Sequence, residues 1–262
     1  MKKTLTLVAL LALLALPSRL VQAQNLLDNG NLDLTHAEEI VPGFFLPKPN
    51  TWENVGTRTL TGPYEDEMSS EPWAGPAPTP VTTDGNANAD HPEGCGGPDC
   101  AVFFKPFSGG GLNGPATGHL YQDIAATPGL RYTLTGWAGA EANFLGDAQL
   151  AVEFLDVGGN EIPLSGSELD LIAAGLFVPN GQPFNYKQYM VMATAPDDAA
   201  SVRARVSMIN GLSNPLGGGQ AFVVDDFELT AIPEPSSIAL GVVSILSAAA
   251  LARRRRRRAI VG

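Results

Sequence analysis

Wherever apolar residues cluster between positions 24 and 232, they alternate with polar ones at a period of two, and no long helical period of 3.6 occurs. This pattern predicts short β-strands separated by turns rich in Gly, Pro, Asn and Asp. The expected strands are 101–105, 119–124, 130–138, 148–156, 186–194, 202–209 and 221–230, with weaker ones at 25–29 and 55–61. A short helix is expected near residues 168–174, and long loops are expected over residues 62–98.

The alternation also assigns a buried and a wet face to each strand. In residues 202–209 the apolar side chains at even positions share one face, whereas Arg203 and Arg205 share the other. Strands with one buried and one wet face are typical of antiparallel sheets packed as a sandwich. The expected fold is therefore all-β, an antiparallel β-sandwich of the jelly-roll type, in one domain over residues 24–231.

The first 23 residues contain the parts of an export signal in the usual order. Lys2 and Lys3 precede an apolar run, and Val21-Gln22-Ala23 offers small residues at both key positions of a cleavage site. We expect a signal helix over residues 1–23 that signal peptidase removes, so that the exported protein begins at Gln24. A buried core helix or an N-terminal membrane anchor is the alternative.

The C-terminal segment, residues 232–258, contains a second ordered set of features. Pro233-Glu234-Pro235 precedes an apolar run over residues 238–252, and Arg253-Arg254-Arg255 begins a run of six arginines. As a helix, 15 apolar residues span roughly 22 Å, less than the ~30 Å hydrocarbon core of a bilayer. Arginines resist crossing the membrane. The segment therefore predicts a short transmembrane helix that tethers the body at its C-terminus.

These features resemble the PEP-CTERM sorting signal of Gram-negative bacteria. The resemblance covers residues 232–258 and implies that an exosortase-type sorting enzyme cuts at the Pro-Glu-Pro motif. It also implies a localisation: first a precursor tethered to the inner membrane, then a protein of the cell surface or the extracellular polysaccharide matrix.

Charge narrows the choice of partners. The whole chain has 16 basic and 27 acidic residues, but residues 24–232 hold only seven basic residues against 26 acidic ones. So acidic a body is repelled by phosphate backbones, which excludes nucleic acid as a partner. The negative charge of the body favours solubility and the binding of divalent cations instead.

Two cysteines, Cys95 and Cys100, flank a turn-forming Gly-Gly-Pro-Asp segment. In an oxidising compartment they are expected to form a disulfide that closes a short loop, worth about 2 kcal/mol by chain entropy. The alternative is a metal site built from these cysteines with His91, Glu93 and Asp99, although a second ligand pair with zinc-site spacing is missing.

Motifs along the body resemble those of galactose-binding-like jelly rolls and follow one another in the same order. They are Asn29-Gly30-Asn31-Leu32-Asp33, Asp84-Gly85-Asn86, Leu120-Tyr121-Gln122-Asp123-Ile124, the segment 130–138, and Val224-Asp225-Asp226-Phe227-Glu228-Leu229. Together they span most of residues 25–230. That group includes many carbohydrate-binding modules and also domains with no known ligand.

The same resemblance implies a structural calcium ion where the first and last strands meet. Carried over to this chain, its ligands would be Asp33 and Asp225, with Asp226 adjacent. Strand alternation places Asp225 on the buried face with Phe227 and Leu229, and Asp226 on the opposite face. A buried carboxylate needs strong partners, and calcium, with six to eight oxygen ligands, is one solution. Hydrogen bonds from backbone amides are the other.

Sugar binding needs aromatic rings on which an apolar sugar face can lie. The candidates are Trp52, Tyr64, Trp73 and Trp137. Trp73 lies among prolines and is expected to be exposed. Trp137 has the parity opposite to that of Tyr132 and is expected to face a cleft. The alternative is that each ring packs under a loop or covers a sheet edge.

Catalytic motifs are scarce. The chain has three histidines and no Gly-x-Ser-x-Gly or His-Glu-x-x-His pattern, and so many acids make carboxylate pairs uninformative. We therefore expect a non-catalytic, exported protein that binds polysaccharide. One alternative is a structural or adhesive matrix component with no small ligand. Another is a polysaccharide hydrolase, which requires two carboxylates or a partnered histidine in a concave site.

Overall fold

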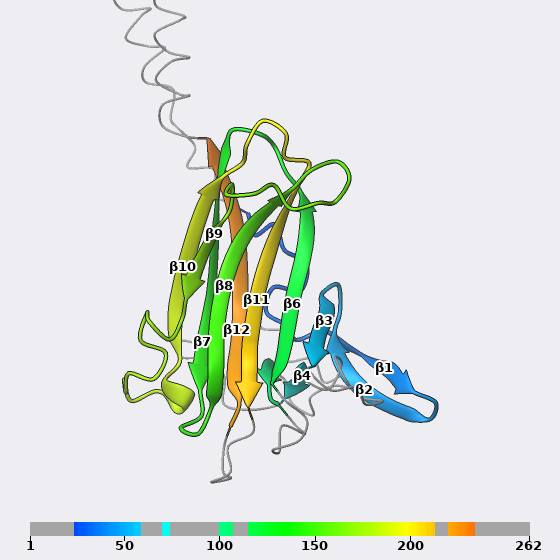
Figure 1. Cartoon of the computed structure of the whole chain (residues 1–262), viewed down its shortest axis with the longest axis vertical. Coiled ribbons are helices and arrows are strands. Elements are labelled where there is room, and N and C mark those ends of the chain that lie inside the picture. The colour runs from blue at the N-terminus through cyan, green and yellow to red at the C-terminus, as the bar shows by residue number, and fades with distance from the viewer. Residues whose placement is uncertain (1–23, 59–69, 74–99, 107–114, 213–219, 234–262) are drawn as a thin grey trace, which may run out of the picture.

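The protein is an antiparallel β-sandwich, as the computed structural model of the chain shows for residues 24–58, 70–73, 100–106, 115–212 and 220–233. Two five-stranded sheets form its layers, and a separate two-stranded hairpin projects from one end (Figure 1). Every strand pair in the described ranges is antiparallel. The predicted fold class is therefore confirmed.

We name each of the two layers after one of its inner strands. The β7 sheet has the order β10 (Lys187–Thr194), β7 (Leu130–Ala140), β12 (Phe222–Pro233), β5 (Ala101–Phe104) and β4 (Ser70–Trp73). The β11 sheet has the order β3 (Glu53–Arg58), β6 (Ala116–Ala125), β11 (Ser201–Leu212), β8 (Leu145–Leu155) and β9 (Ser167–Asp170). The hairpin consists of β1 (Thr35–Val41) and β2 (Phe44–Pro49). Each of the seven main strands expected from the sequence is observed, mostly lengthened by a few residues.

The core lies between the two sheets and follows the predicted alternation. Val152 and Phe154 of β8 are fully buried, as are Val202 and Ala204 of β11. The ring of Phe154 meets that of Tyr132 from the opposite sheet edge-on, with 5.8 Å between centroids. Burying each large apolar side chain contributes roughly 1.5–3 kcal/mol, so this shared core holds the two sheets together.

Residues 168–174 do not form the expected helix. The first of them belong to β9, which pairs with the edge of β8, and the chain then turns. Asp170 Oδ1 accepts a hydrogen bond from the backbone N–H of Ala173 at 3.0 Å, and Gly175 adopts a φ of 92°. A free strand edge and a glycine-dependent turn therefore outweigh the local helix propensity of this short segment.

The prediction of a weak strand at residues 25–29 is also wrong, because the segment forms a turn. The Asn25 side chain and isolated backbone hydrogen bonds, such as that from Leu26 N–H to the Leu229 carbonyl at 2.8 Å, join this segment to β12 in place of a regular ladder. Asn29 has a φ of 53°. The β1–β2 hairpin and β4 were not predicted. Pro47 and Pro49 lie within β2. Proline in a sequence argues against a strand, although an edge strand tolerates it.

A β-bulge in β12 changes the faces assigned to its residues. Asp225 pairs with Trp137 and Glu228 with Thr135, so two residues of β12 oppose one residue of β7. Asp226, within the bulge, has a φ of 49°. Asp225 is fully buried, as expected, but it lies on the outer face of the β7 sheet beside Trp137 and not on the face between the sheets.

Several predicted features lie outside the described residues. They are the signal segment 1–23, Tyr64, the loop with His91, Glu93, Cys95 and Asp99, and the sorting segment from Glu234 and Pro235 to Arg253, Arg254 and Arg255. The disulfide between Cys95 and Cys100 and the transmembrane helix therefore stay predictions. Within the part of the chain that the structure describes, no helix is long and apolar enough to cross a membrane.

Candidate functional site

The opening segment, residues 25–34, is docked onto β12 beside the bulge. Asn25 Nδ2 donates to the carbonyl oxygen of Phe227 at 2.9 Å, and Asn25 Oδ1 accepts from the backbone N–H of Leu229 at 2.9 Å. The backbone N–H of Phe227 in turn donates to the carbonyl of Gly30 at 2.7 Å. One asparagine side chain thus serves groups that a paired strand would otherwise bind, and the segment forms a wall over the edge of the sheet.

Gln122 of β6 holds the same opening segment in place through hydrogen bonds. Its side chain is buried, with 5% exposure, and its Oε1 accepts from the N–H of Asp28 at 2.9 Å. Its Nε2 donates to the carbonyl oxygens of Asp28 and Thr51 at 2.9 and 3.0 Å. A buried amide with donors and acceptors matched in this way orders both chain segments that it touches.

Trp52 supports the wall from within the core. Its side chain is 6% exposed, its Nε1 donates to the carbonyl of Asn29 at 3.0 Å, and its ring lies 5.3 Å from that of Phe227. The structure therefore places this ring under the opening segment, where it offers no exposed face to a sugar. Trp73 is the last residue of β4.

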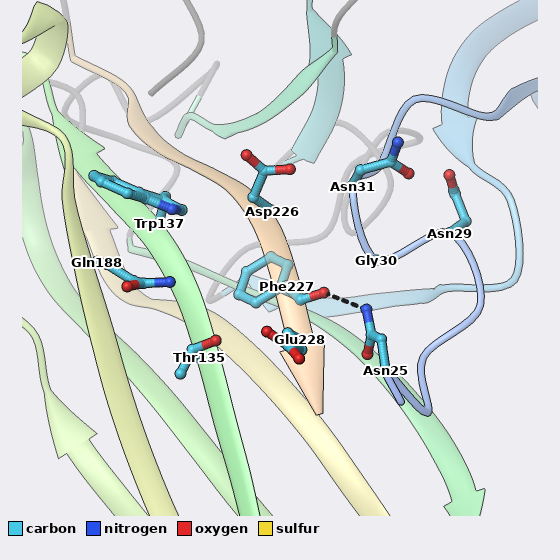
Figure 2. A pocket seen from close by; sticks show the side chains of 10 residues that line it. All are labelled: Asn25, Asn29, Gly30, Asn31, Thr135, Trp137, Gln188, Asp226, Phe227 and Glu228. Atoms are coloured by element: carbon cyan, nitrogen blue, oxygen red, sulfur yellow. Dashed lines mark hydrogen bonds between the residues drawn. The ribbon is translucent and has the colours of Figure 1, made fainter. Parts of the chain in front are cut away.

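Between this wall and the outer face of the β7 sheet lies a pocket of about 540 Å³ (Figure 2). It is lined by residues of β7, β10, β12 and the opening segment: Asn25, Asn29, Gly30, Asn31, Thr135, Trp137, Gln188, Asp226, Phe227 and Glu228. Four of these carry carboxamides, two carry carboxylates and one carries an indole. We call it the Trp137 pocket.

Strand pairing explains why these side chains meet. Gln188 of β10 lies opposite Trp137 on β7, and Glu228 of β12 lies opposite Thr135. Directly paired residues project from the same face of a sheet, so four side chains form two adjacent rows on the outer face. Figure 2 shows the indole of Trp137 on one side of the pocket and Asp226 nearer the opening segment. The face predicted for Trp137 from its parity is the one observed.

The carboxylates predicted to bind calcium are placed as follows. Asp33 is 5% exposed; its Oδ1 accepts from the backbone N–H of Cys100 at 2.8 Å and its Oδ2 from Asn31 Nδ2 at 2.6 Å. Asp225 Oδ1 accepts from the N–H of Asp226 at 2.8 Å. Three of these carboxylate oxygens thus face N–H donors, and no group of three acidic, His or Cys residues suited to a metal occurs in the described ranges. Calcium stays a prediction.

A second hollow, of about 380 Å³, lies on the outer face of the β11 sheet. Its charged groups are bound to one another. Both Nε and Nη2 of Arg203 donate to the Asp123 carboxylate, at 2.7 and 2.8 Å, and the guanidinium lies 3.9 Å from the centroid of the Tyr121 ring. Arg205 pairs with Glu153 at 2.5 Å. Because these contacts occupy both arginines and one face of the Tyr121 ring, the Trp137 pocket is the stronger binding candidate.

The histidine in this second hollow also serves the local network. His119 Nδ1 lies 2.7 Å from Ser207 Oγ, and Ser207 is fully buried. Burial, followed by the nearby positive charge of Arg205, lowers the pKa of His119. A neutral imidazole held against a buried hydroxyl suits a structural role, because that hydroxyl is not accessible to a substrate.

Sequence reasoning missed Asn25, Gln122 and Gln188 as residues that build or line the site. Gln122 carried a usable signal: it occupies a core-facing position of β6 at the parity of buried Leu120, where a polar side chain needs specific partners. Asn25 and Gln188 gave no such signal, since each contributes through neighbours far away in the sequence.

No protein-family model matches the sequence, and no curated protein matches it. Solved structures with a similar fold include the enzymatically active domain of tailspike protein 4 from bacteriophage CBA120, at 15% identity and a TM-score of 0.48, covering 79% of this chain and 21% of that one. The carbohydrate-binding module TmCBM61, solved with β-1,4-galactotriose, has 17% identity and a TM-score of 0.39, covering 81% and 100%.

A cleaved adhesin domain of Lys-gingipain from Porphyromonas gingivalis is also similar, at 16% identity and a TM-score of 0.36, covering 77% of this chain and 99% of that one. This chain is similar to these proteins in its β-sandwich fold. Because every one of these TM-scores lies below 0.5, we take no functional residue from them.

Proposed function

We propose that this protein is a non-catalytic carbohydrate-binding protein and that its binding site is the Trp137 pocket. The observation that carries the proposal is the half-buried indole of Trp137 in one pocket with four carboxamides and two carboxylates. A pyranose ring has an apolar face, which lies well on an indole, and an edge of hydroxyls, which amides and carboxylates bind by hydrogen bonds. The β7 sheet carries the indole, Gln188 and both carboxylates, and the opening segment carries the other three carboxamides.

Replacing the indole tests this proposal. Trp137→Ala is expected to weaken retention on a polysaccharide that the native protein binds by at least about tenfold, because the stacking surface is lost. Tyr121→Ala, on the opposite sheet, is the matched control and should leave retention unchanged. Affinity electrophoresis in gels containing single polysaccharides measures both variants. Retention that survives Trp137→Ala, or that is lost in the Tyr121 variant instead, would contradict the assignment of the site.

A second candidate, hydrolysis of a polysaccharide, is favoured by one observation: Asp226 and Glu228 line the same pocket. Two carboxylates are what a glycosidase uses, but one of them must be a protonated acid, which usually requires an apolar setting. Glu228 is exposed to solvent. We therefore favour binding without cleavage, and an assay for newly formed reducing ends separates the two functions.

We further propose that the protein is exported and sorted to the cell surface or the extracellular matrix, with signal peptidase and an exosortase-type enzyme as its processing partners. The support is the ordered signal segment and the Pro233-Glu234-Pro235, apolar and arginine features of the sequence. Intact-mass measurement of the native protein after cell fractionation is expected to show a start at Gln24, loss of the tail and a disulfide-linked cysteine pair. A full-length chain in the cytosol with free thiols would overturn this proposal.

A further inference from the structure

The two turns that follow β8 each expose an apolar side chain at the tip. Val157 is 97% exposed and Leu164 is completely exposed. Among the other large apolar side chains described, the most exposed is Val178, at 56%. Single apolar residues are ordinary on a protein surface, but full exposure of two in neighbouring turns points to a contact surface. We call Val157 and Leu164 the apolar tips.

The backbone at Leu164 makes this leucine hard to explain by folding alone. Ser165 donates to the carbonyl of Ile162 from its N–H at 3.3 Å and from its Oγ at 2.6 Å, which closes a turn over Pro163 and Leu164. Leu164 has a φ of 61°, a conformation for which turns favour glycine. A leucine thus stands where glycine would fold better, and its side chain packs against nothing in the domain. Such a conflict is expected where a residue serves a contact with another molecule.

These turns lie at the same end of the sandwich as the C-terminal end of β12. Pro233, the last residue of β12, pairs with Leu130, whose carbonyl accepts from the N–H of Ala195 at 2.9 Å. In the other sheet, the N–H of Ala200 donates to the carbonyl of Leu155, the last residue of β8, at 2.8 Å. Figure 1 shows the end of β12 and the loops after β6, β8 and β10 together at the top of the view.

The sequence places the predicted membrane segment close to this end. Four residues separate Pro233 from Ile238, where the apolar run begins. Even fully extended, this connection spans at most about 18 Å. If residues 238–252 enter a bilayer, they hold this end of the sandwich, with its apolar tips, near the membrane surface.

We propose that the apolar tips insert into the lipid bilayer to which the C-terminal segment tethers the protein, so that the β8–β9 loop is a membrane-docking surface of the precursor. This inference rests on the membrane tether of the proposed function. Apolar side chains gain free energy when they leave water for the boundary between headgroups and acyl chains. Two side chains bind weakly by themselves, but a short tether raises their effective concentration at the bilayer to the millimolar range. Removal of the tail would then release the body.

Charge at this end favours neutral lipid headgroups. Three turns meet there, residues 126–129, 156–166 and 195–200, and together they contain four acidic residues and no Lys or Arg. The adjacent basic residues lie within strands: Arg131 is half-buried in β7, and Arg203 is paired with Asp123. An anionic bilayer would repel these turns. Docking through the apolar tips should therefore be stronger on phosphatidylcholine than on phosphatidylglycerol.

Tryptophan quenching by brominated lipid measures the docking. The full-length chain is placed in nanodiscs of phosphatidylcholine with plain or brominated acyl chains, and the three native tryptophans form a common background. Val157→Trp adds an emitter at one tip. Val178→Trp, the matched control, adds one in the connection between β9 and β10 at the other end of the sandwich (Figure 1). Bromination is expected to remove most of the emission that Val157→Trp adds and none of that added by Val178→Trp.

Leu164→Gly shows whether the tips cause the docking. Glycine adopts a φ of 61° without strain, so this variant is expected to fold. Combined with Val157→Trp, it should lower the fraction of the added emission that bromination quenches, whereas Val178→Ser in the same protein should not. Added salt, which screens charge, should leave the quenching unchanged.

The outcomes separate this inference from the proposed tether. A chain that enters nanodiscs but shows equal quenching in the two tryptophan variants overturns the docking and leaves the tether intact. Quenching that persists undiminished in Leu164→Gly, or that salt abolishes, also overturns it. A full-length chain that stays in solution without detergent and does not enter nanodiscs overturns both.

Discussion

Gly30→Ala is expected to release the opening segment from β12 and to abolish the Trp137 pocket. A Cβ atom at this position would collide with the carbonyl oxygen of Phe227 and would lie 2.8 Å from Asn25 Nδ2. The backbone oxygen is part of the β12 bulge and has little room to move. We expect a loss of about 2–4 kcal/mol in the free energy of unfolding, measured by urea denaturation, and a parallel loss of glycan retention.

Gly43→Ala is the control for this variant. Gly43 lies in the turn of the β1–β2 hairpin with a φ of 81°, and nothing lies within 4 Å of the added Cβ. Its cost should be that of a left-handed alanine, about 1–2 kcal/mol, with retention on polysaccharide unchanged. Equal destabilisation by both variants with retention preserved in each would show that close approach at Gly30 does not build the pocket.

The sandwich was predictable from the sequence because burial on one face imposes a period of two on every long strand. β8 and β11 illustrate this: Val152 and Phe154 on one strand, and Val202 and Ala204 on the other, are buried at alternate positions. Short elements were less predictable. β9 has only four residues, too few for a period to stand out from local helix propensity, and its pairing with β8 decides its conformation.

The bulge in β12 was the main feature that alternation did not predict. One extra residue at Asp226 moves every later side chain to the other face, so Asp225 could not share the core with Phe227 and Leu229. The consequence for function is direct. The bulge places Asp226 in the pocket and frees the backbone of Phe227 to bind Gly30. A local departure from strand geometry thus builds part of the candidate site.

The candidate site itself was predictable only in part. Trp137 followed from its parity on β7, because that strand is regular as far as the pocket. The presence of Gln188 and Asn25 in the site did not follow from any pattern in the sequence. Strand order brings β10 beside β7, and side-chain hydrogen bonds bring the opening segment beside β12, although these segments are far apart in the sequence. Strand order depends on which pairings bury the most apolar surface in the whole domain, and a pattern within one strand carries no record of it.

Gln122→Leu is expected to destabilise the protein by about 3 kcal/mol, because leucine matches the volume of glutamine but makes none of its hydrogen bonds. The N–H of Asp28 and the carbonyl of Thr51 would lose this partner, and the carbonyl of Asp28 would keep only its contact with the Thr51 hydroxyl at 3.0 Å. The opening segment should then dock less firmly, so hydrogen exchange at its amides is expected to accelerate. Thermal and urea denaturation measure the change in stability.

Gln122→Glu separates the donor role of this side chain from its acceptor role. Glutamate keeps an acceptor for the N–H of Asp28, but it can donate only when protonated, and then to only one of the carbonyls of Asp28 and Thr51. Burial beside these carbonyls should raise the pKa of the introduced carboxyl in the folded state. Its stabilising contribution should therefore be full at low pH and be lost as pH rises through that raised pKa.

Gln149→Leu, on the outer face of the same sheet, is the control for Gln122→Leu and should change stability by less than about 0.5 kcal/mol. A Gln122→Leu protein as stable as the Gln149 variant would show that the buried amide does not anchor the opening segment.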